Sequence, residues 1–295
     1  MKVLLTGATG YIGKAVAKEL LESGHHVIGT ARSQEQAAFL KSCGVEPLIA
    51  DLSQSNLIAA CATTCDGLIH TAASHAQNKA ELDRGLTQHI INSFAGTGKP
   101  FIYTSGVWVM GDQGEKLCDE TTTLNPAAIS AWRVDVEQLV LYAKEKNIRT
   151  CVLRPSIVWG GPQGLSSGGL ILEILNSGTD SLRYVGDGHN FWSFIEVADL
   201  AKLYVLALER AEPGSLYIAT QDQALTLKQV VEMLAESKGL QAFSWPLEDA
   251  REKLGTYADA LAISLKVTGQ KAHQELGFSP TKFFPANQKE VVSIL

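Results

Sequence analysis

The sequence predicts an α/β protein built on a doubly wound parallel sheet, with a smaller cap formed mainly by its C-terminal part. Three observations favour this fold class. A short apolar run at residues 3–5 leads directly into a turn with glycines at positions 7, 10 and 13. Short apolar runs then alternate with helical patterns through the first half of the chain, which is typical of a parallel sheet covered on both faces. After Arg154, glycine-rich loops and shorter helical segments replace this alternation.

The apolar runs and helical patterns define the predicted elements. We expect strands at residues 3–5, 26–30, 46–50, 67–71, 100–105 and 149–153, and helices at 11–21, 78–95, 131–146, 197–209 and 226–238. Residues 1–160 are predicted to form the main domain, to which 186–220 return, while 161–185 and 221–295 form the cap. Ligands of such sheets bind at the carboxyl ends of the strands, so the chemistry is expected there.

Composition excludes several classes of function. The 295 residues carry 25 basic and 31 acidic side chains, a net charge of −6, without a basic block that would indicate a nucleic-acid partner. No apolar run approaches the roughly 18 residues of a membrane span, so we expect a cytoplasmic protein without a membrane partner. The five cysteines are scattered and lack metal-ligand spacing, which favours structural thiols and no metal site. Either a monomer or a homodimer is compatible with the sequence.

The first glycine-rich turn has the layout of a dinucleotide-phosphate site, in which a strand, a glycine turn and a helix follow one another. Glycines allow the tight turn and let the backbone approach a pyrophosphate. The N-terminus of the following helix then offers free N–H groups and a partial positive charge. The residues predicted to hold the cofactor here are Gly7, Thr9, Gly10, Tyr11, Ile12 and Gly13.

The spacing of these glycines, G-x-x-G-x-x-G, resembles that of the extended and atypical short-chain dehydrogenases/reductases, the group that holds sugar-nucleotide epimerases and flavonoid reductases. Residues 69–73 and 153–160 resemble further segments of this family. The resemblance extends over about residues 2–210 of the chain. It implies a Rossmann fold, a nicotinamide cofactor and a small-molecule substrate. The additional cofactor contacts that it implies are Asp51 and Leu52 at the adenine, Thr71, Ala72 and Ala73 beneath the cofactor, and Pro155.

The end of the second predicted strand indicates which cofactor is used. A carboxylate at this position accepts hydrogen bonds from the ribose 2′-hydroxyl of NAD, whereas an arginine favours the 2′-phosphate of NADP. Here the small Ala31 stands in the acidic position and is followed by Arg32 and Ser33. The sequence therefore predicts NADP, with NAD the less favoured alternative.

The active-site pattern of the family is broken in this chain. The resemblance implies a serine, then a tyrosine about twenty-five residues later, then a lysine four residues after it. The corresponding positions hold Gly106, Ile129 and Arg133. The guanidinium of Arg133 can hold a ribose hydroxyl or a phosphate, but it cannot exchange a proton near neutral pH. Ile129 has no acid–base chemistry, so the usual proton donor is missing.

Other side chains near the predicted strand ends could complete the site. His75 follows the fourth strand and has an ordinary pKa suited to proton transfer at neutral pH. Ser105, at the end of the fifth strand, could polarise a substrate carbonyl. A pocket wall suited to a planar or apolar substrate is predicted from Trp108, Trp159, Asn190 and Trp192.

These features leave three functions open. The first is an NADP-dependent reductase of a small carbonyl compound with a relocated acid. The second is a non-enzymatic sensor that binds NADP and reports the redox state to a protein partner. The third is an isomerase, epimerase or lyase that uses the same pocket. A sensor would bind the cofactor without ever oxidising it in the presence of carbonyl compounds.

Overall fold

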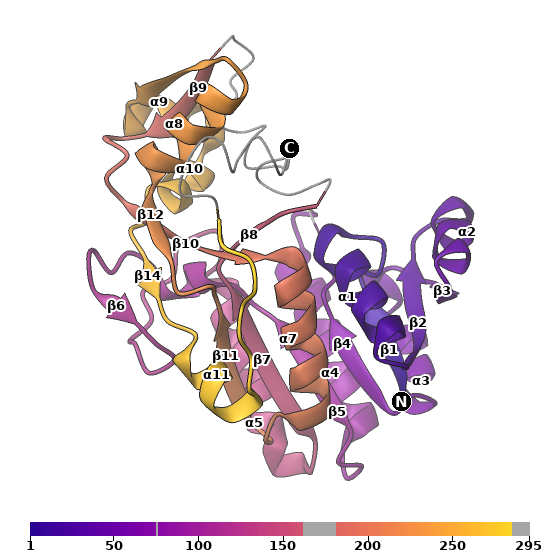
Figure 1. The fold of residues 1–295 in the computed structure, drawn as a ribbon. Coiled ribbons are helices and arrows are strands. Elements are labelled where there is room, and N and C mark those ends of the chain that lie inside the picture. Colours follow the sequence, from indigo (N-terminus) through magenta and orange to yellow (C-terminus); the bar gives the residue numbers. More distant parts are fainter. Residues whose placement is uncertain (75, 162–180, 285–295) are drawn as a thin grey trace.

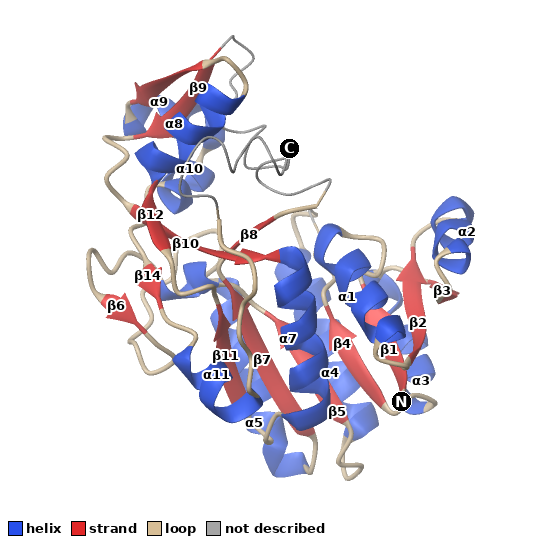
Figure 2. Ribbon diagram, viewed as in Figure 1, coloured by secondary structure: helices blue, strands red, loops and turns tan. Residues whose placement is uncertain are grey.

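The computed structural model describes residues 1–74, 76–161 and 181–284. Its centre is a sheet of seven parallel strands in the order β11-β7-β5-β4-β1-β2-β3 (Figures 1 and 2). The strand bounds are β1 Lys2–Thr6, β2 His26–Ala31, β3 Glu46–Ile49, β4 Gly67–His70, β5 Pro100–Thr104, β7 Arg149–Pro155 and β11 Ser215–Ala219. The six predicted strands are therefore confirmed, and β11 adds a seventh.

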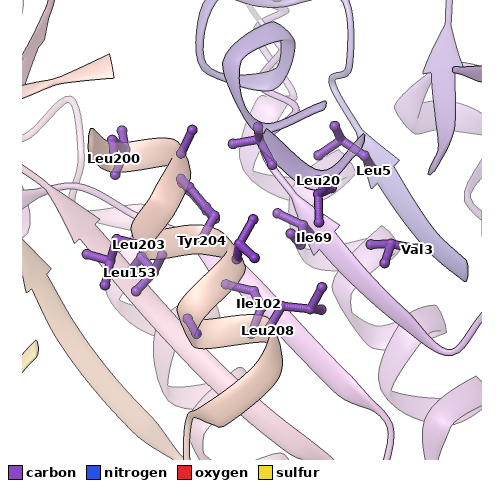
Figure 3. Packing of buried hydrophobic residues seen from close by; sticks show 14 of the residues in the cluster. Val3, Leu5, Leu20, Ile69, Ile102, Leu153, Leu200, Leu203, Tyr204 and Leu208 are labelled. Atoms are coloured by element: carbon purple, nitrogen blue, oxygen red, sulfur yellow. The ribbon is translucent and has the colours of Figure 1, made fainter. Parts of the chain in front are cut away.

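Alternation along the strands divides the core into two layers. Val3 and Leu5 of β1 pack with the helices α1, α2 and α7, whereas Leu4, between them, packs with α3, α4 and α5 on the opposite face. Figure 3 shows the first layer, where Leu20 and Leu203 lie above strand residues. The helix bounds are α1 Tyr11–Glu22, α2 Gln34–Ser42, α3 Ser55–Thr63, α4 Lys79–Phe94, α5 Trp132–Tyr142 and α7 Val197–Arg210.

The order of the strands places a switch point beside β1. From β1 the chain moves to β2 and β3 on one side, and then returns to pair β4 with the other side of β1, in the register Thr6↔His70. The loops that follow β1 and β4 consequently diverge above the sheet. This is where open α/β sheets bind their ligands.

The cap lies beyond the carboxyl end of the sheet, because β7 continues almost directly into β8 (Figure 1). It has its own apolar core, which includes Leu182, Leu227 and Trp245. The elements of the cap and of its connection to the sheet are β8 Ile157–Trp159, β9 Ser181–Val185, β10 Phe191–Glu196, β12 Ala224–Thr226, α8 Leu227–Ser237, β13 Gln241–Trp245, α9 Leu247–Leu254 and α10 Thr256–Leu261. Strands β8, β10 and β12 form one small sheet, and β9 and β13 form another.

The end of the described chain returns to the main domain, which differs from the expected cap segment 221–295. Helix α11, Gln270–Leu276, packs against β11 and α7, and its Ala272 and Leu276 join the core layer of α1 and α7. A further pair, β6 Leu117–Cys118 with β14 Lys266–Val267, ties the segment before α11 to the main domain. The expected cap segment 161–185 falls largely outside the described residues.

Two expectations about the chain as a whole can be compared with the structure. Cys65, Cys118 and Cys151 are buried, but Cys43 is exposed at the end of α2, so it is not a core thiol. Within residues 1–74, 76–161 and 181–284, no helix combines the length and the apolar character that crossing a bilayer requires.

Candidate cofactor and active site

Each of the three glycines in the first loop is a glycine for a different structural reason. Gly7 has a φ of +76°, and a Cβ there would lie 2.7 Å from the backbone of Ala72. A Cβ on Gly13 would lie only 2.0 Å from the carbonyl oxygen of Gly7. At Gly10, by contrast, the same carbonyl oxygen, 3.2 Å away, is the one atom of the described residues that a Cβ would meet. Packing of the loop therefore requires Gly7 and Gly13, whereas Gly10 borders space that the described residues leave open.

The N-terminus of α1 is prepared for an anion. The N-cap residue, Gly10, has no side chain with which to cap the helix, and the first turn contains no acidic residue. Thr30, at the end of β2, supports the loop by accepting a hydrogen bond from the Gly7 N–H at 3.0 Å. Thr71, directly after β4, also supports the loop, since its hydroxyl donates to the Thr6 carbonyl at 2.8 Å. Free N–H groups, a helix dipole and open space above Gly10 together fit a pyrophosphate.

The ends of β2 and β3 bring the predicted specificity residues together. Ala31 is buried, while Arg32, Ser33 and Asp51 are exposed. Ser33 caps α2 by accepting from the Gln36 N–H. Hydrogen bonds from Ser53, assisted by the charge of Arg32, hold the pKa of Asp51 below its ordinary value. The Arg32 guanidinium makes no hydrogen bond or ion pair with the described part of the chain, so it is available to an anion.

The end of β5 carries a buried hydroxyl without a partner. Thr104 is engaged, since its hydroxyl lies 2.6 Å from that of Tyr204. The neighbouring Ser105 is 8% exposed, and its Oγ has no hydrogen-bond partner among the residues that the structure describes. Burying an unpaired hydroxyl costs about 1–3 kcal/mol, and such an atom in a folded protein needs an explanation. A ligand oxygen placed at this strand end would provide one.

Arg133 is held next to this serine. From α5, its Nη1 donates to the carbonyl oxygen of Thr104 at 3.0 Å and approaches the Tyr103 hydroxyl at 3.4 Å. Its guanidinium also stacks on the ring of Trp132, 4.5 Å from the centroid. A planar guanidinium fixed in this way keeps donors for a further acceptor, such as a ribose hydroxyl.

A buried polar network below Arg133 was not predicted. Asp83, on the inner face of α4, accepts hydrogen bonds from His70 at 2.8 Å and from the Tyr103 hydroxyl at 2.6 Å. The other ring nitrogen of His70 lies 2.5 Å from the hydroxyl of Thr6. The network therefore connects the residue before the glycine loop with the tyrosine that contacts Arg133. A signal was present in the sequence, because Asp83 interrupts the apolar face of a helix and must find partners there.

Burial, hydrogen bonds and neighbouring charges determine which groups of this network are protonated. Burial opposes ionisation of Asp83, yet hydrogen bonds from His70 and Tyr103 and the charges of His70 and Arg133 hold its pKa below the ordinary value. Burial first, and then the neighbouring Asp83, raises the pKa of Tyr103 well above its ordinary value. Tyr103 therefore stays protonated and acts as a fixed donor to an ionised carboxylate.

A second buried pair fixes α5 on the sheet. Arg154 of β7 donates through Nε and Nη2 to the carboxylate of Glu137, with distances of 2.5–3.2 Å, and both side chains are almost fully buried. Pro155 follows in the same strand and is also buried. Such a bidentate pair holds the helix, and with it Arg133 one turn earlier, in one position.

Most of the predicted pocket wall lies elsewhere. Trp159 and Trp192 are buried in the cap core, where their indole N–H groups donate to Gln221 Oε1 at 2.9 Å and to the Leu261 carbonyl at 3.2 Å. Asn190 donates to the backbone carbonyls of Leu261, at the end of α10, and of Ile263, just after it. These side chains act in packing. Trp108, in the turn Val107–Met110 after β5, is half-buried and contacts both the cap and the main domain.

Three further candidates can be placed or set aside. Tyr11 at the start of α1 donates to the carbonyl oxygen of Gly160 at 2.6 Å and so connects the glycine loop with the chain leaving the sheet. Burial, and to a lesser degree Glu196, raises its pKa. Ile129 packs at the edge of an apolar cluster that includes Val109 and Ala260. His75 lies outside the described residues. No cluster of three or more metal-ligating side chains occurs in the parts of the chain that are described.

The doubly wound sheet, the glycine loop at the N-terminus of α1 and the polar groups at the strand ends define a nucleotide-binding protein of the Rossmann type. The model of the NAD dependent epimerase/dehydratase family matches residues 3–219. The chain belongs to this family, and thereby to the NAD(P)-dependent oxidoreductases of the extended short-chain dehydrogenase/reductase type.

Individual relatives agree with this placement. An uncharacterized protein of Schizosaccharomyces pombe is 32% identical over 286 residues, covering 95% of each chain. A 4-hydroxy-2-methyl-3-oxo-4-farnesyl-3,4-dihydroquinoline-1-oxide ketoreductase of Stigmatella aurantiaca is 28% identical over 310 residues, covering 95% of this chain and 92% of the relative. In structure, a dTDP-glucose 4,6-dehydratase of Bacillus anthracis, solved in complex with NAD, has a TM-score of 0.80 at 18% identity, covering 99% and 96% of the two chains.

Proposed function

We propose that this protein is an NADPH-dependent reductase of a small carbonyl compound with a planar or apolar body. The observation that carries the proposal is the unpaired, buried hydroxyl of Ser105, which adjoins the backbone carbonyl that fixes Arg133. A carbonyl oxygen at this strand end would satisfy the hydroxyl. The Stigmatella relative is named as a ketoreductase, which supports reduction over the other reactions of the family.

Each residue has a defined task in such a reaction. The glycine loop and the N-terminus of α1 hold the pyrophosphate, and the fixed guanidinium of Arg133 holds a hydroxyl of the nicotinamide ribose. When bound, the reduced nicotinamide supplies a hydride to the carbonyl carbon. Ser105 donates a hydrogen bond to the carbonyl oxygen and stabilises the negative charge that develops on it. The aromatic face of Trp108, just after Ser105, offers an apolar surface to the substrate.

The proposal is tested with a panel of aldehydes and ketones that runs from small aliphatic to planar aromatic compounds. Loss of NADPH in step with formation of the alcohol supports it, and planar or apolar members of the panel should react best. A protein that binds NADPH well but never consumes it would be a redox sensor instead. Conversion of a compound to its isomer without net loss of NADPH would indicate an isomerase or epimerase.

We expect NADP(H) to bind more tightly than NAD(H), because Arg32 is exposed without an ion-pair partner among the described residues and Ala31 places no carboxylate at the end of β2. A charge-assisted contact with phosphate contributes roughly 1.5–3 kcal/mol, or about ten- to a hundredfold in affinity. Calorimetric titration of both cofactors should show this preference. Arg32→Ala should weaken NADP(H) alone, while Lys41→Ala, an exposed cation further along α2, should change neither affinity. Equal affinities in the wild type would refute the assignment.

A further inference from the structure

The missing family tyrosine leaves the reaction without an identified proton donor. In the position of that tyrosine, Ile129 packs in a cluster that includes Ala260 of the cap helix α10. The cap therefore contributes to the cluster that holds the loop from which the family's acid would act. This arrangement points to the cap as the source of the donor, and the inference rests on the proposed reductase function.

The other tyrosines can be sorted by their partners. Four have hydroxyls engaged with other groups: Tyr11 with Gly160, Tyr103 with Asp83, Tyr204 with Thr104, and Tyr217 with Glu275. Tyr142 is 69% exposed near the end of α5. The remaining two, Tyr184 of β9 and Tyr257 of α10, are half-buried in the cap, and neither hydroxyl has a hydrogen-bond partner in the described part of the chain.

Only Tyr257 of these two is placed beside the predicted active site. Its ring packs edge-on against Trp108, with the centroids 5.7 Å apart and the planes at 84°. Trp108 lies two residues after Gly106, the family's serine position, and its carbonyl accepts a hydrogen bond from the Ala127 N–H at 3.2 Å. Ala127 stands two residues before Ile129. The phenol thus lies against the turn that links the position of the family's serine with the loop that has lost the tyrosine.

We propose that Tyr257 of the cap donates the proton that the family's own tyrosine would deliver. As the carbonyl carbon receives a hydride, the electron pair of the C=O π bond moves to the oxygen. The O–H bond of the phenol breaks and an O–H bond forms on the product alcohol. The phenolate that remains recovers a proton from water. An alkoxide is a stronger base than a phenolate, so this transfer is favourable.

The environment of Tyr257 keeps it protonated over the working range. Burial raises the pKa of its hydroxyl, and no charged group of the described residues adds to or opposes this shift. The ion pair of Asp259 with Arg251, on the same and the preceding helix, is exposed. With Tyr257 as donor, the rate of reduction stays level as the pH rises through neutrality and falls only as the phenol ionises, above its ordinary value of about 10. With His75 as donor, the rate falls as the pH rises through about 6.5, the ordinary pKa of a histidine, because the protonated form is lost.

The test compares Tyr257→Phe with Tyr184→Phe, a matched control from the same cap core. Phenylalanine retains the aromatic ring in both variants, including the ring of residue 257 that packs on Trp108. Both variants should therefore fold, and thermal melting verifies this. Tyr257→Phe should lower kcat by about 10²-fold. Its affinity for the carbonyl substrate, measured by calorimetry without cofactor, should fall about three- to tenfold through loss of the hydrogen bond. The affinity for NADPH should be unchanged, and Tyr184→Phe should behave as wild type in every assay.

The possible results distinguish a failure of the role of Tyr257 from a failure of the proposed reductase function. Equal kcat and equal substrate affinity in Tyr257→Phe and Tyr184→Phe would overturn the role of Tyr257 while leaving the reductase function standing. A hundredfold loss in His75→Ala, with a neutral inflection in the wild-type pH profile, would move the donor to His75. A wild type that binds NADPH but turns over no carbonyl compound would remove the reductase function itself, and the donor with it.

Discussion

Replacing Gly10 with valine is expected to abolish NADP(H) binding and to leave the protein folded. Within the described structure a new Cβ would meet one atom, the Gly7 carbonyl oxygen at 3.2 Å, so the loop needs to move by only a few tenths of an ångström. The backbone at Gly10 is extended, with φ −78° and ψ 174°, which suits a β-branched residue. The two methyl groups would then occupy the open space in which the pyrophosphate must lie. Calorimetric titration with NADPH and a thermal melt measure the two effects separately.

Gly13→Ala supplies the contrasting variant. Its Cβ would lie 2.0 Å from the Gly7 carbonyl oxygen, inside the helix–loop contact, so this substitution should destabilise the fold by about 1–3 kcal/mol or more. The pair therefore separates a glycine that leaves room for the ligand from one that packing requires. Undiminished NADPH binding by a folded Gly10→Val protein would show that the phosphate site is elsewhere.

Ser105→Ala is expected to lower kcat by about 10²-fold, the usual effect of losing a principal donor to a developing oxyanion. The same change should not destabilise the protein. Because the hydroxyl is buried without a partner in the described structure, its removal breaks no hydrogen bond and relieves up to about 1–3 kcal/mol of desolvation cost. Lower activity with equal or higher stability is the expected signature of a group reserved for a ligand. Steady-state kinetics and denaturant unfolding measure the two quantities.

The chain offers a matched control for this serine. Thr150 also has a buried hydroxyl without a described partner, but it lies near the start of β7, away from the carboxyl ends of the strands. Thr150→Val should match Ser105→Ala in the direction of its stability change and leave kcat unaltered. Ile129→Ala, at the lost tyrosine position, should cost less than about tenfold in rate. Unimpaired turnover by Ser105→Ala would exclude it as the group that polarises the carbonyl.

The fold could be predicted from the sequence to the extent that each element depends on local pattern. The apolar runs allowed all six predicted strands to be located within two residues of their observed ends, because a parallel strand inside a covered sheet is mostly apolar. Strand β11 and helix α11 were not predicted. Each is short, and each is fixed by packing against β7 or α7, which lie far away in the sequence.

The candidate site divides in the same way. The glycine loop could be identified because a strand, a turn and a helix in direct succession build it. The network of Asp83, His70 and Tyr103 was missed, since three separate elements bring its members together. Trp159 and Trp192 were predicted as pocket residues because they lie in segments expected near the substrate, but their side chains pack in the cap core. The place of a segment does not reveal which way each of its side chains faces.

Transfer of a deuterium label tests the central claim, that this chain reduces carbonyl compounds with NADPH, most directly. Wild-type protein is incubated with NADPH carrying deuterium on one face of C4 and with the best substrate of the carbonyl panel, and the product is examined by mass spectrometry and NMR. The reductase account predicts one deuterium on the new carbinol carbon from one labelled face and none from the other. Failure to find label in any product, from a protein that binds NADPH tightly, would contradict the account.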